Sequence, residues 1–352
     1  MTKDHMLAAM YHGPGDLRLE KYPMPEIGPD EALLKVVSAG ICGTDLRIFH
    51  GGHRMYADGV QRIPGHEVVG EIVAVGENVS GMHVGAMVFV SPNMGCGHCN
   101  QCVSGNNNRC ADYDAFGITI DGAFAEYLRI PSEAIRQGNL IPLEPGIDPG
   151  VAALIEPLAC VLRGQNAVGL HLGDLVLIVG AGPIGLMHVL LAKLRGAAKV
   201  IVSEVQDARL LRALEVGADV GVNPQKDDLS NVGARQSGGK GADVIIIAAP
   251  AHAAQENALR LAAIGGRVNL FGGLPKDMST ISFDSNMVHY KELIVTGTTA
   301  CSTADCRQAA AIINAGRLDL SPLISARYSL NQALEAFEHA QDQMALKIII
   351  EP

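Results

Sequence analysis

The chain has 352 residues, more than a single hydrophobic core usually serves, so two domains are expected. Hydrophobic residues make up 48% and charged residues 18%, proportions typical of a soluble protein with a large buried core. The net charge of −10, without a long run of either sign, argues against nucleic acid or acidic lipid as a partner.

The N-terminal segment, MTKDHMLAAMYHGPGD, has no apolar core of the kind that a secretory signal needs. The uncharged stretch 175–192 is long enough to resemble a membrane span, but its glycines follow a nucleotide-loop pattern. A buried strand, turn and helix explain it better, so we expect a cytoplasmic protein with no membrane partner.

The first ~155 residues are predicted to be rich in strands, because short apolar runs such as EALLKVVSAGI alternate with Gly, Pro, Asn and Asp. Four dispersed residues stand out here: Cys42 in AGICGTD, His66 and Glu67 in PGHEVVG, and Glu156 in LIEPLAC. A thiolate, an imidazole and carboxylates can hold zinc while leaving a position open for water or an alcohol, as catalytic zinc sites do. Taken one at a time, Cys42 could be a small core thiol, His66 a hydrogen-bonded core histidine and Glu156 a helix cap. Together they favour zinc.

Half of the eight cysteines lie in CGHCNQCVSGNNNRC, at Cys96, Cys99, Cys102 and Cys110. In a reducing cytosol such a cluster indicates metal rather than disulfides. Four thiolates close a tetrahedral shell around zinc and leave no position for substrate, so the predicted site is structural. An iron–sulfur cluster fits less well, because its usual last gap is three residues followed by Pro, whereas here seven residues intervene and Ala follows. Unmetallated thiols are the remaining alternative.

The pattern changes near Gly173. DLVLIVGAG, KVIVSEV, DVGVN, ADVIIIAAP and GGRVNLFGG read as strands, with helical segments such as QDARLLRALEVGA between them. Alternating strands and helices predict a doubly wound parallel sheet, so the fold class is α/β. The last ~55 residues hold a predicted helix, NQALEAFEHAQD, and a final strand, ALKIIIEP.

The loop GAGPIG follows a strand and opens a helix. Gly180 allows the tight turn, Gly182 lets the backbone approach a pyrophosphate, and Gly185 lets helix and strand pack closely. Glu204 ends the next strand, 19 positions after Gly185, where a carboxylate accepts hydrogen bonds from ribose hydroxyls and repels a 2′-phosphate. NAD is therefore predicted over NADP. Arg209 either contacts the adenosine or is a solvated helix residue.

The GHE followed by VVGEIVAVG, the four-cysteine stretch, the EP before the nucleotide domain and GAGPIGL together resemble the zinc-containing medium-chain dehydrogenases, in particular the sorbitol/polyol and threonine dehydrogenase branch. The resemblance covers essentially the whole chain. It implies a GroES-like, partly open β-barrel catalytic domain from residues 1–158 and 297–352, and a Rossmann NAD-binding domain from residues 159–296. It also implies a homotetramer or homodimer.

The resemblance assigns roles to single residues. Cys42, His66 and Glu67 match the catalytic zinc ligands, and Glu156 matches an acid that either binds zinc or hydrogen-bonds its water. Which of Glu67 and Glu156 binds zinc directly stays open. The matched cofactor-contact positions are Gly180, Gly182, Pro183, Ile184, Gly185, Glu204, Arg209, Phe271, Gly272, Gly273 and Thr298.

The implied reaction is hydride transfer from a zinc-bound alcohol to NAD. Thr44, where relatives carry Ser or Thr, would accept the alcohol proton, or else caps a helix or turn. Many relatives continue the relay with a histidine five residues after the zinc cysteine, but this chain has Arg47, which cannot release a proton. The proton would leave through water, the ribose hydroxyls or His50.

The segment RIFHGGHRMYADGVQR carries Arg47, Arg54, Arg62, His50 and His53 against one acid, Asp58. This excess favours an anionic substrate group such as a phosphate, or is a solvated loop or subunit contact. Sorbitol dehydrogenases carry an arginine soon after the glycine matching Gly297, and GTTACS lacks it. This difference argues against sorbitol itself. The expected substrate is a secondary alcohol of a polyol or sugar alcohol, with or without a phosphate group. L-Threonine, simple secondary alcohols and an inert nucleotide-binding scaffold are the alternatives.

Overall fold

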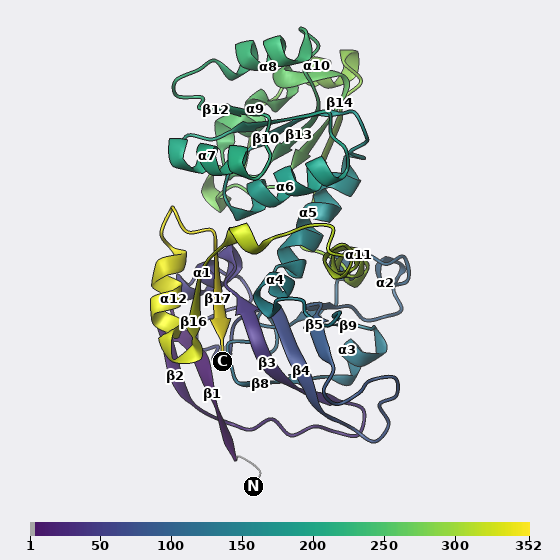
Figure 1. The fold of residues 1–352 in the computed structure, drawn as a ribbon, viewed down its shortest axis with the longest axis vertical. Helices are drawn as coiled ribbons and strands as arrows, with labels where there is room; N and C mark the ends of the chain where they lie inside the picture. The colour runs from purple at the N-terminus through teal and green to yellow at the C-terminus, as the bar shows by residue number, and fades with distance from the viewer. Residues whose placement is uncertain (1–3) are drawn as a thin grey trace. The chain divides into compact units, whose positions relative to one another are not determined.

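A computed structural model describes residues 4–352, which fold into two compact units. The first unit comprises the described part of Met1–Ala159 together with Cys301–Pro352, and the second is Cys160–Ala300 (Figure 1). The chain thus leaves the first unit once and returns to it. The boundaries predicted from the sequence are 158/159 and 296/297.

The first unit is built mainly from antiparallel strands. Its described strands are β1 (His5–Gly13), β2 (Asp16–Pro23), β3 (Ala32–Gly40), β4 (Glu67–Val75), β5 (Met87–Val90), β6 (Asn93–Met94), β7 (Asp114–Ala115), β8 (Tyr127–Ile130), β9 (Leu140–Pro142), β16 (Ile324–Ser329) and β17 (Lys347–Glu351). Most join one curved sheet in the order β16-β17-β3-β4-β5-β9, with β8 on β3. Because β17 pairs with β3, the C-terminal strand completes a sheet begun by the N-terminal third.

The described α-helices of this unit are α1 (Gly43–Phe49), α2 (Asn100–Val103), α3 (Ser132–Arg136), α4 (Pro149–Ala153), α11 (Thr303–Asn314) and α12 (Ala333–Ala340). Helix α5 (Ile155–Ala167) continues from this unit into the second. The predicted C-terminal helix and final strand are confirmed as α12 and β17. Helix α11 was missed, although Ser302 and Asp305 form the capping box that begins it.

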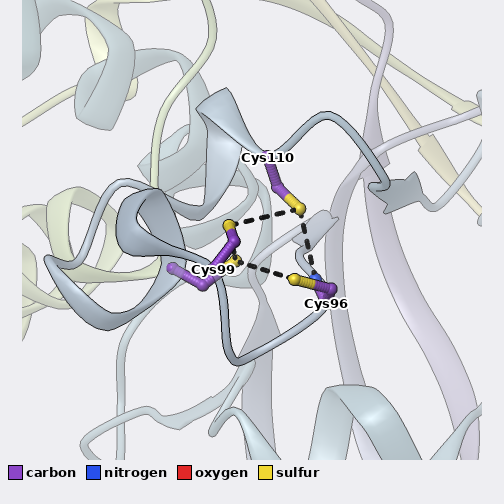
Figure 2. Close-up of side chains that lie close together, drawn as sticks. Cys96, Cys99 and Cys110 are labelled. Atoms are coloured by element: carbon purple, nitrogen blue, oxygen red, sulfur yellow. Dashed lines mark hydrogen bonds between the residues drawn. The ribbon is translucent and has the colours of Figure 1, made fainter.

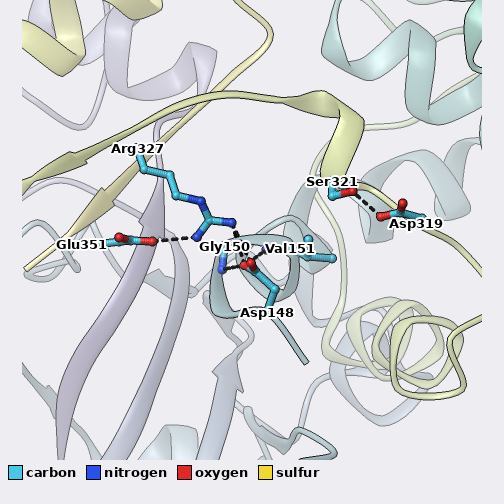
Figure 3. A network of polar contacts seen from close by, with 7 residues as sticks. All are labelled: Asp148, Gly150, Val151, Asp319, Ser321, Arg327 and Glu351. Atoms are coloured by element: carbon cyan, nitrogen blue, oxygen red, sulfur yellow. Dashed lines mark hydrogen bonds and ion pairs between the residues drawn. The ribbon is translucent and has the colours of Figure 1, made fainter. Parts of the chain in front are cut away.

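An arginine ties the returning C-terminal segment to α4. Arg327 on β16 donates to both carboxylate oxygens of Asp148 at 2.8 Å and pairs with Glu351 on β17 at 2.6 Å (Figure 3). Asp148 is also the N-cap of α4 and accepts from the amides of Gly150 and Val151. This network fixes the short helix that precedes α5 and Glu156.

The second unit is the doubly wound domain that the alternating pattern predicted. Its strands are β10 (Leu175–Val179), β11 (Lys199–Ser203), β12 (Val220–Val222), β13 (Ala242–Ile247), β14 (Ala262–Leu270) and β15 (Ile294–Gly297), all parallel in the order β12-β11-β10-β13-β14-β15. Its helices are α6 (Pro183–Leu194), α7 (Asp207–Glu215), α8 (Leu229–Ser237), α9 (His252–Leu261) and α10 (Ser285–Tyr290). Figure 1 shows α6 and α7 on one face of the sheet and α9 on the other.

The central strands are apolar because helices cover both faces of the sheet. Val176, Ile178 and Val202 are fully buried, and Ile245 and Val268 belong to the core under the other face. All six strands run the same way, so the loops that follow them gather at one edge, where such sheets bind ligands. Within residues 4–352, no helix has the length and apolarity that crossing a membrane requires.

Candidate functional site

The first candidate ligand, Cys42, is the N-cap of α1, directly after β3. The buried Asp45 carboxylate accepts hydrogen bonds from the Cys42 amide at 2.8 Å and from the Gly65 amide at 3.2 Å. One side chain therefore fixes the start of α1 beside the residue that precedes His66.

Asp45 also faces the His66 imidazole. Its Oδ1 lies 3.4 Å from Nδ1, an ion-pair distance, although Nδ1 makes no hydrogen bond of good geometry to any described residue. Burial opposes protonation of His66, but Asp45 and Cys42 outweigh it and hold the imidazole pKa well above its ordinary value. A carboxylate behind one ring nitrogen is how proteins orient a metal-binding histidine through the other.

The Glu67 carboxylate is fully buried and has one strong partner. Oε1 accepts from the Lys347 ammonium on β17 at 2.6 Å, and this ammonium also donates to the Ile41 carbonyl at 2.7 Å. Oε2 has no hydrogen-bond partner among the described residues and lies against Gly40, where an added Cβ would sit 2.0 Å from it. Burial raises the pKa of Glu67; Lys347 opposes this rise and Glu156 adds to it.

Ligand atoms of Cys42, His66 and Glu67 all lie within 4.8 Å of one another. At this spacing all three atoms can bind one zinc ion at the usual bond lengths of about 2.0–2.3 Å. The unsatisfied Glu67 oxygen is the kind of buried atom that a cation would satisfy. Three protein donors leave a fourth tetrahedral position open, so the set fits the catalytic type of zinc site.

Glu156 lies in the first turn of α5 and is not part of that three-residue group. The Cys301 thiol donates to its Oε1 at 3.5 Å, and Cys306 lies 3.5 Å from Cys301, sulfur to sulfur. In this structure Glu156 therefore lies outside the group formed by Cys42, His66 and Glu67.

Thr44 is the second residue of α1 and is half-buried. Because Cys42 is the N-cap, Thr44 does not cap this helix. Its hydroxyl makes no hydrogen bond with any residue between 4 and 352 and so remains available to a ligand.

The four cysteines of the stretch 96–110, called the lobe cysteines below, lie together, with all four sulfurs within 4.8 Å of one another. The sulfur of Cys99 lies 3.8 Å from that of Cys110 (Figure 2). The sulfur of Cys102 lies 3.5 Å from that of Cys99 and 4.0 Å from that of Cys96. Four sulfurs bound at zinc–thiolate distance in a tetrahedron are about 3.8 Å apart. Backbone amides of His98 and Cys99 lower the pKa of Cys96 to about 6, which favours its thiolate, whereas burial raises the pKa of Cys102 to about 12. These residues fit a closed four-thiolate zinc site.

The second unit carries the nucleotide loop between β10 and α6. Gly180 has φ +102°, a conformation that side chains rarely adopt, and a Cβ on Gly185 would lie 1.9 Å from the Gly180 carbonyl oxygen. A Cβ on Gly182 would approach only Arg209, at 4.0 Å. Gly180 and Gly185 are thus required by packing, whereas Gly182 leaves open space beside the start of α6.

Glu204 follows β11, and its carboxylate oxygens accept from the Ala181 amide at 2.8 Å and the Gln206 amide at 3.0 Å. It lines a hollow of about 580 Å³ together with Gly180 and Ser203. Each oxygen keeps a lone pair for a hydroxyl donor. Arg209 lies on α7 and approaches the same loop.

The remaining predicted cofactor positions lie on α6 or follow strands at the same edge. Pro183 and Ile184 open α6, Phe271–Gly273 follow β14, and Thr298 follows β15. The Gly272 amide donates to Ile247 at 2.7 Å, and the Asn269 amide group reaches the Thr298 hydroxyl at 3.5 Å. The structure brings these positions to the carboxyl edge of one sheet.

Two residues of the site were missed from the sequence. Asp45 stands three residues after Cys42, a capping-box spacing that could have identified it. Lys347 is the one charge in the run ALKIII, and a lysine within an apolar strand needs a buried partner.

Comparisons with known proteins place both halves of the chain. The family description "Alcohol dehydrogenase GroES-like domain" matches residues 28–145, and "Zinc-binding dehydrogenase" matches residues 183–315. An L-threonine 3-dehydrogenase of Pyrococcus horikoshii is 36% identical over 343 residues, 95% of each chain. A sorbitol dehydrogenase of Halalkalibacterium halodurans is 31% identical over 351 residues, 98% of each.

A solved structure of a protein from Sinorhizobium meliloti 1021, bound to NADP, superposes with a TM-score of 0.91 at 33% identity, covering 99% of this chain and 100% of its own. These matches span both units and confirm the predicted GroES-like and Rossmann folds. The chain belongs to the zinc-containing medium-chain dehydrogenase family.

Proposed function

We propose that this protein oxidises a secondary alcohol of a polyol or sugar alcohol, with or without a phosphate group, and transfers the hydride to NAD. The observation that carries the proposal is the buried Cys42–His66–Glu67 group, whose ligand atoms lie within 4.8 Å of one another. A zinc ion held by a thiolate, an imidazole and a carboxylate would keep a fourth coordination position for an alcohol oxygen.

A zinc ion held by these residues would act as a Lewis acid on the alcohol oxygen. The Thr44 hydroxyl, two residues after Cys42, would accept the alcohol proton. Arg47 cannot pass it on, because a guanidinium stays protonated. The proton then leaves through water, the cofactor ribose or the exposed His50. Glu156 would exchange with Glu67 at the ion or bind its water.

The cofactor proposed is NAD rather than NADP. Glu204 lies beside the Gly180–Gly182 loop with a lone pair free on each oxygen, which suits ribose hydroxyls and repels a 2′-phosphate. Because a similar solved structure holds NADP, the two cofactors need to be compared directly. A second zinc, held by the four lobe cysteines, would be structural and raise the total to two per chain.

L-Threonine is the second candidate substrate. The threonine dehydrogenase relative is more similar to this chain than the sorbitol dehydrogenase relative, at 36% against 31% identity. An inert nucleotide-binding scaffold is disfavoured, because all the predicted zinc-binding residues are present.

A screen of NADH and NADPH formation tests the proposal. Zinc-loaded protein would be assayed with polyols, polyol phosphates, L-threonine and simple secondary alcohols. Turnover of a polyol class with NAD is expected. Turnover of threonine alone, or of NADP in preference to NAD, would replace the corresponding part of the proposal.

A homo-oligomer, dimer or tetramer, is also proposed. Strand β15 ends the described sheet of the second unit and exposes Ile294 (55%) and Val295 (38%), with Tyr290 (75%) just before it. Apolar edge strands are commonly covered by another chain. Light scattering at micromolar concentration is expected to give a multiple of 37.0 kDa, and a monomer would refute this.

A further inference from the structure

Two guanidinium groups near the Cys42 group have no polar partner among the described residues. Arg47 lies in the last turn of α1, five residues after Cys42 and therefore about 7.5 Å farther along the helix. Arg54 lies in the loop that leads towards β4, and both side chains are exposed. Neither guanidinium makes a hydrogen bond or ion pair within residues 4–352.

The loop that carries Arg54 is anchored by other residues. Tyr56 is buried, donates to the Gly117 carbonyl at 2.9 Å and packs edge-on against Tyr11. Arg62 lies over the Tyr56 ring at 5.1 Å and donates to the Ile118 carbonyl. The Arg62 side chain therefore stabilises the fold, and of the three arginines in this segment only Arg47 and Arg54 are left for the hypothesis of anion binding.

His53 connects the two arginines to the candidate metal site. Burial lowers its pKa, and the charges of Arg47, Arg54 and His66 lower it further, while Asp45 opposes them. The Gly52 amide donates to the Arg47 carbonyl at 2.9 Å, so the loop that carries Arg54 starts against the last turn of α1, and the charges of both arginines act on the same His53 imidazole. The Met55 amide donates to His53 Nδ1 at 3.3 Å, so the neutral ring carries its proton on Nε2 as an additional donor.

We propose that Arg47 and Arg54 form a subsite for an anionic group of the substrate, a phosphate or a carboxylate, next to the Cys42 group. A guanidinium matches the geometry of an oxyanion and donates two parallel hydrogen bonds to it. That the molecule carrying this anionic group is also the alcohol oxidised at the Cys42 group rests on the proposed function. The binding of an anion by the two arginines does not.

Binding is tested on the zinc-loaded full chain by calorimetry with D-sorbitol 6-phosphate, D-gluconate, inorganic phosphate and D-sorbitol. The variants are Arg47→Gln, Arg54→Gln and their double. Arg136→Gln removes an exposed guanidinium of the same unit as a matched control. We expect each subsite variant to raise the Kd of the preferred anion by about tenfold, since a charge-assisted hydrogen bond is of that order. The control should leave it unchanged.

The two sugar derivatives distinguish a phosphate subsite from a carboxylate subsite. Equal anion affinity in the double variant and the wild type would overturn the proposal, as would no measurable anion binding to the wild type. Loss of NAD affinity with anion affinity retained would assign the arginines to the cofactor and equally overturn it.

Kinetics separate this inference from the proposed function. If no alcohol is oxidised but anion binding depends on the arginines, the reaction is wrong and the subsite stands. If polyols are oxidised, the ratio of kcat/KM for the anionic over the neutral substrate should fall about tenfold in Arg54→Gln. An unchanged ratio would leave the reaction standing without the subsite.

Discussion

At the scale of single residues, Lys347 neutralises a carboxylate buried beside Cys42. Despite burial, Glu67 and Cys42 raise the pKa of Lys347, so the ammonium persists. Breaking a buried ion pair leaves an uncompensated charge, which costs more than the pair itself contributes.

Lys347→Met is therefore expected to reduce the free energy of unfolding of metal-free protein by about 3–5 kcal/mol. Urea unfolding of this variant, Glu67→Gln and the double variant measures it. The double variant should lose much less than the sum of the single variants. Additive losses would show that the two side chains do not interact.

Asp45 is the second residue whose contribution can be isolated. It lies 3.4 Å from His66 and also fixes the start of α1. Asp45→Asn removes the charge behind the imidazole and also one of the two backbone-amide hydrogen bonds, because an amide has a single acceptor oxygen. Zinc at the Cys42 group should then bind about 10–100-fold more weakly. Competition with a chelator measures this affinity. The lobe zinc is the internal control, and equal weakening of both zincs would point to general damage instead.

At the scale of elements, the β10–α6 turn separates packing from ligand binding. Gly185→Ala places a methyl group 1.9 Å from the Gly180 carbonyl oxygen, so α6 must shift. We expect the free energy of unfolding to fall by about 1–3 kcal/mol. Gly182→Ala meets nothing closer than 4.0 Å, so the unit should fold normally and bind NAD more weakly, because the added methyl group faces the pyrophosphate. Thermal unfolding and NAD titration check both. Similar behaviour of the two variants would contradict this division.

Helix α6 also carries a buried histidine. Burial, aided by Arg195, lowers the pKa of His188 to about 3. Between this value and its unfolded pKa, roughly 6.5, the unfolded chain binds more protons, so stability falls as pH falls through that window.

Between pH 7 and pH 5 the wild type should lose roughly 2 kcal/mol more than His188→Leu, by linkage of this one group. Urea unfolding at both pH values provides the comparison, and acid release of zinc affects both proteins alike. Parallel losses would mean that His188 is protonated or hydrated in the folded protein.

At the scale of the whole molecule, local motifs were predictable and distant partners were not. The lobe cysteines lie within fifteen residues and the nucleotide loop within six, so short-range backbone geometry nearly determines each site. Lys347 meets Glu67 across 280 residues, a pairing that exists only after β17 joins β3. The contact between the Cys301 thiol and Glu156 likewise joins residues 145 positions apart, which sequence spacing does not reveal.

We propose that Cys42, His66 and Glu67 hold the zinc used for catalysis and that the four lobe cysteines hold a structural zinc. Zinc content per chain, measured together with NADH formation for wild type and Cys42→Ser, tests it most directly. We expect two zinc ions and turnover in the wild type, and one zinc ion, a folded chain and no turnover in the variant. Two zinc ions in both proteins, or full activity in the variant, would contradict it.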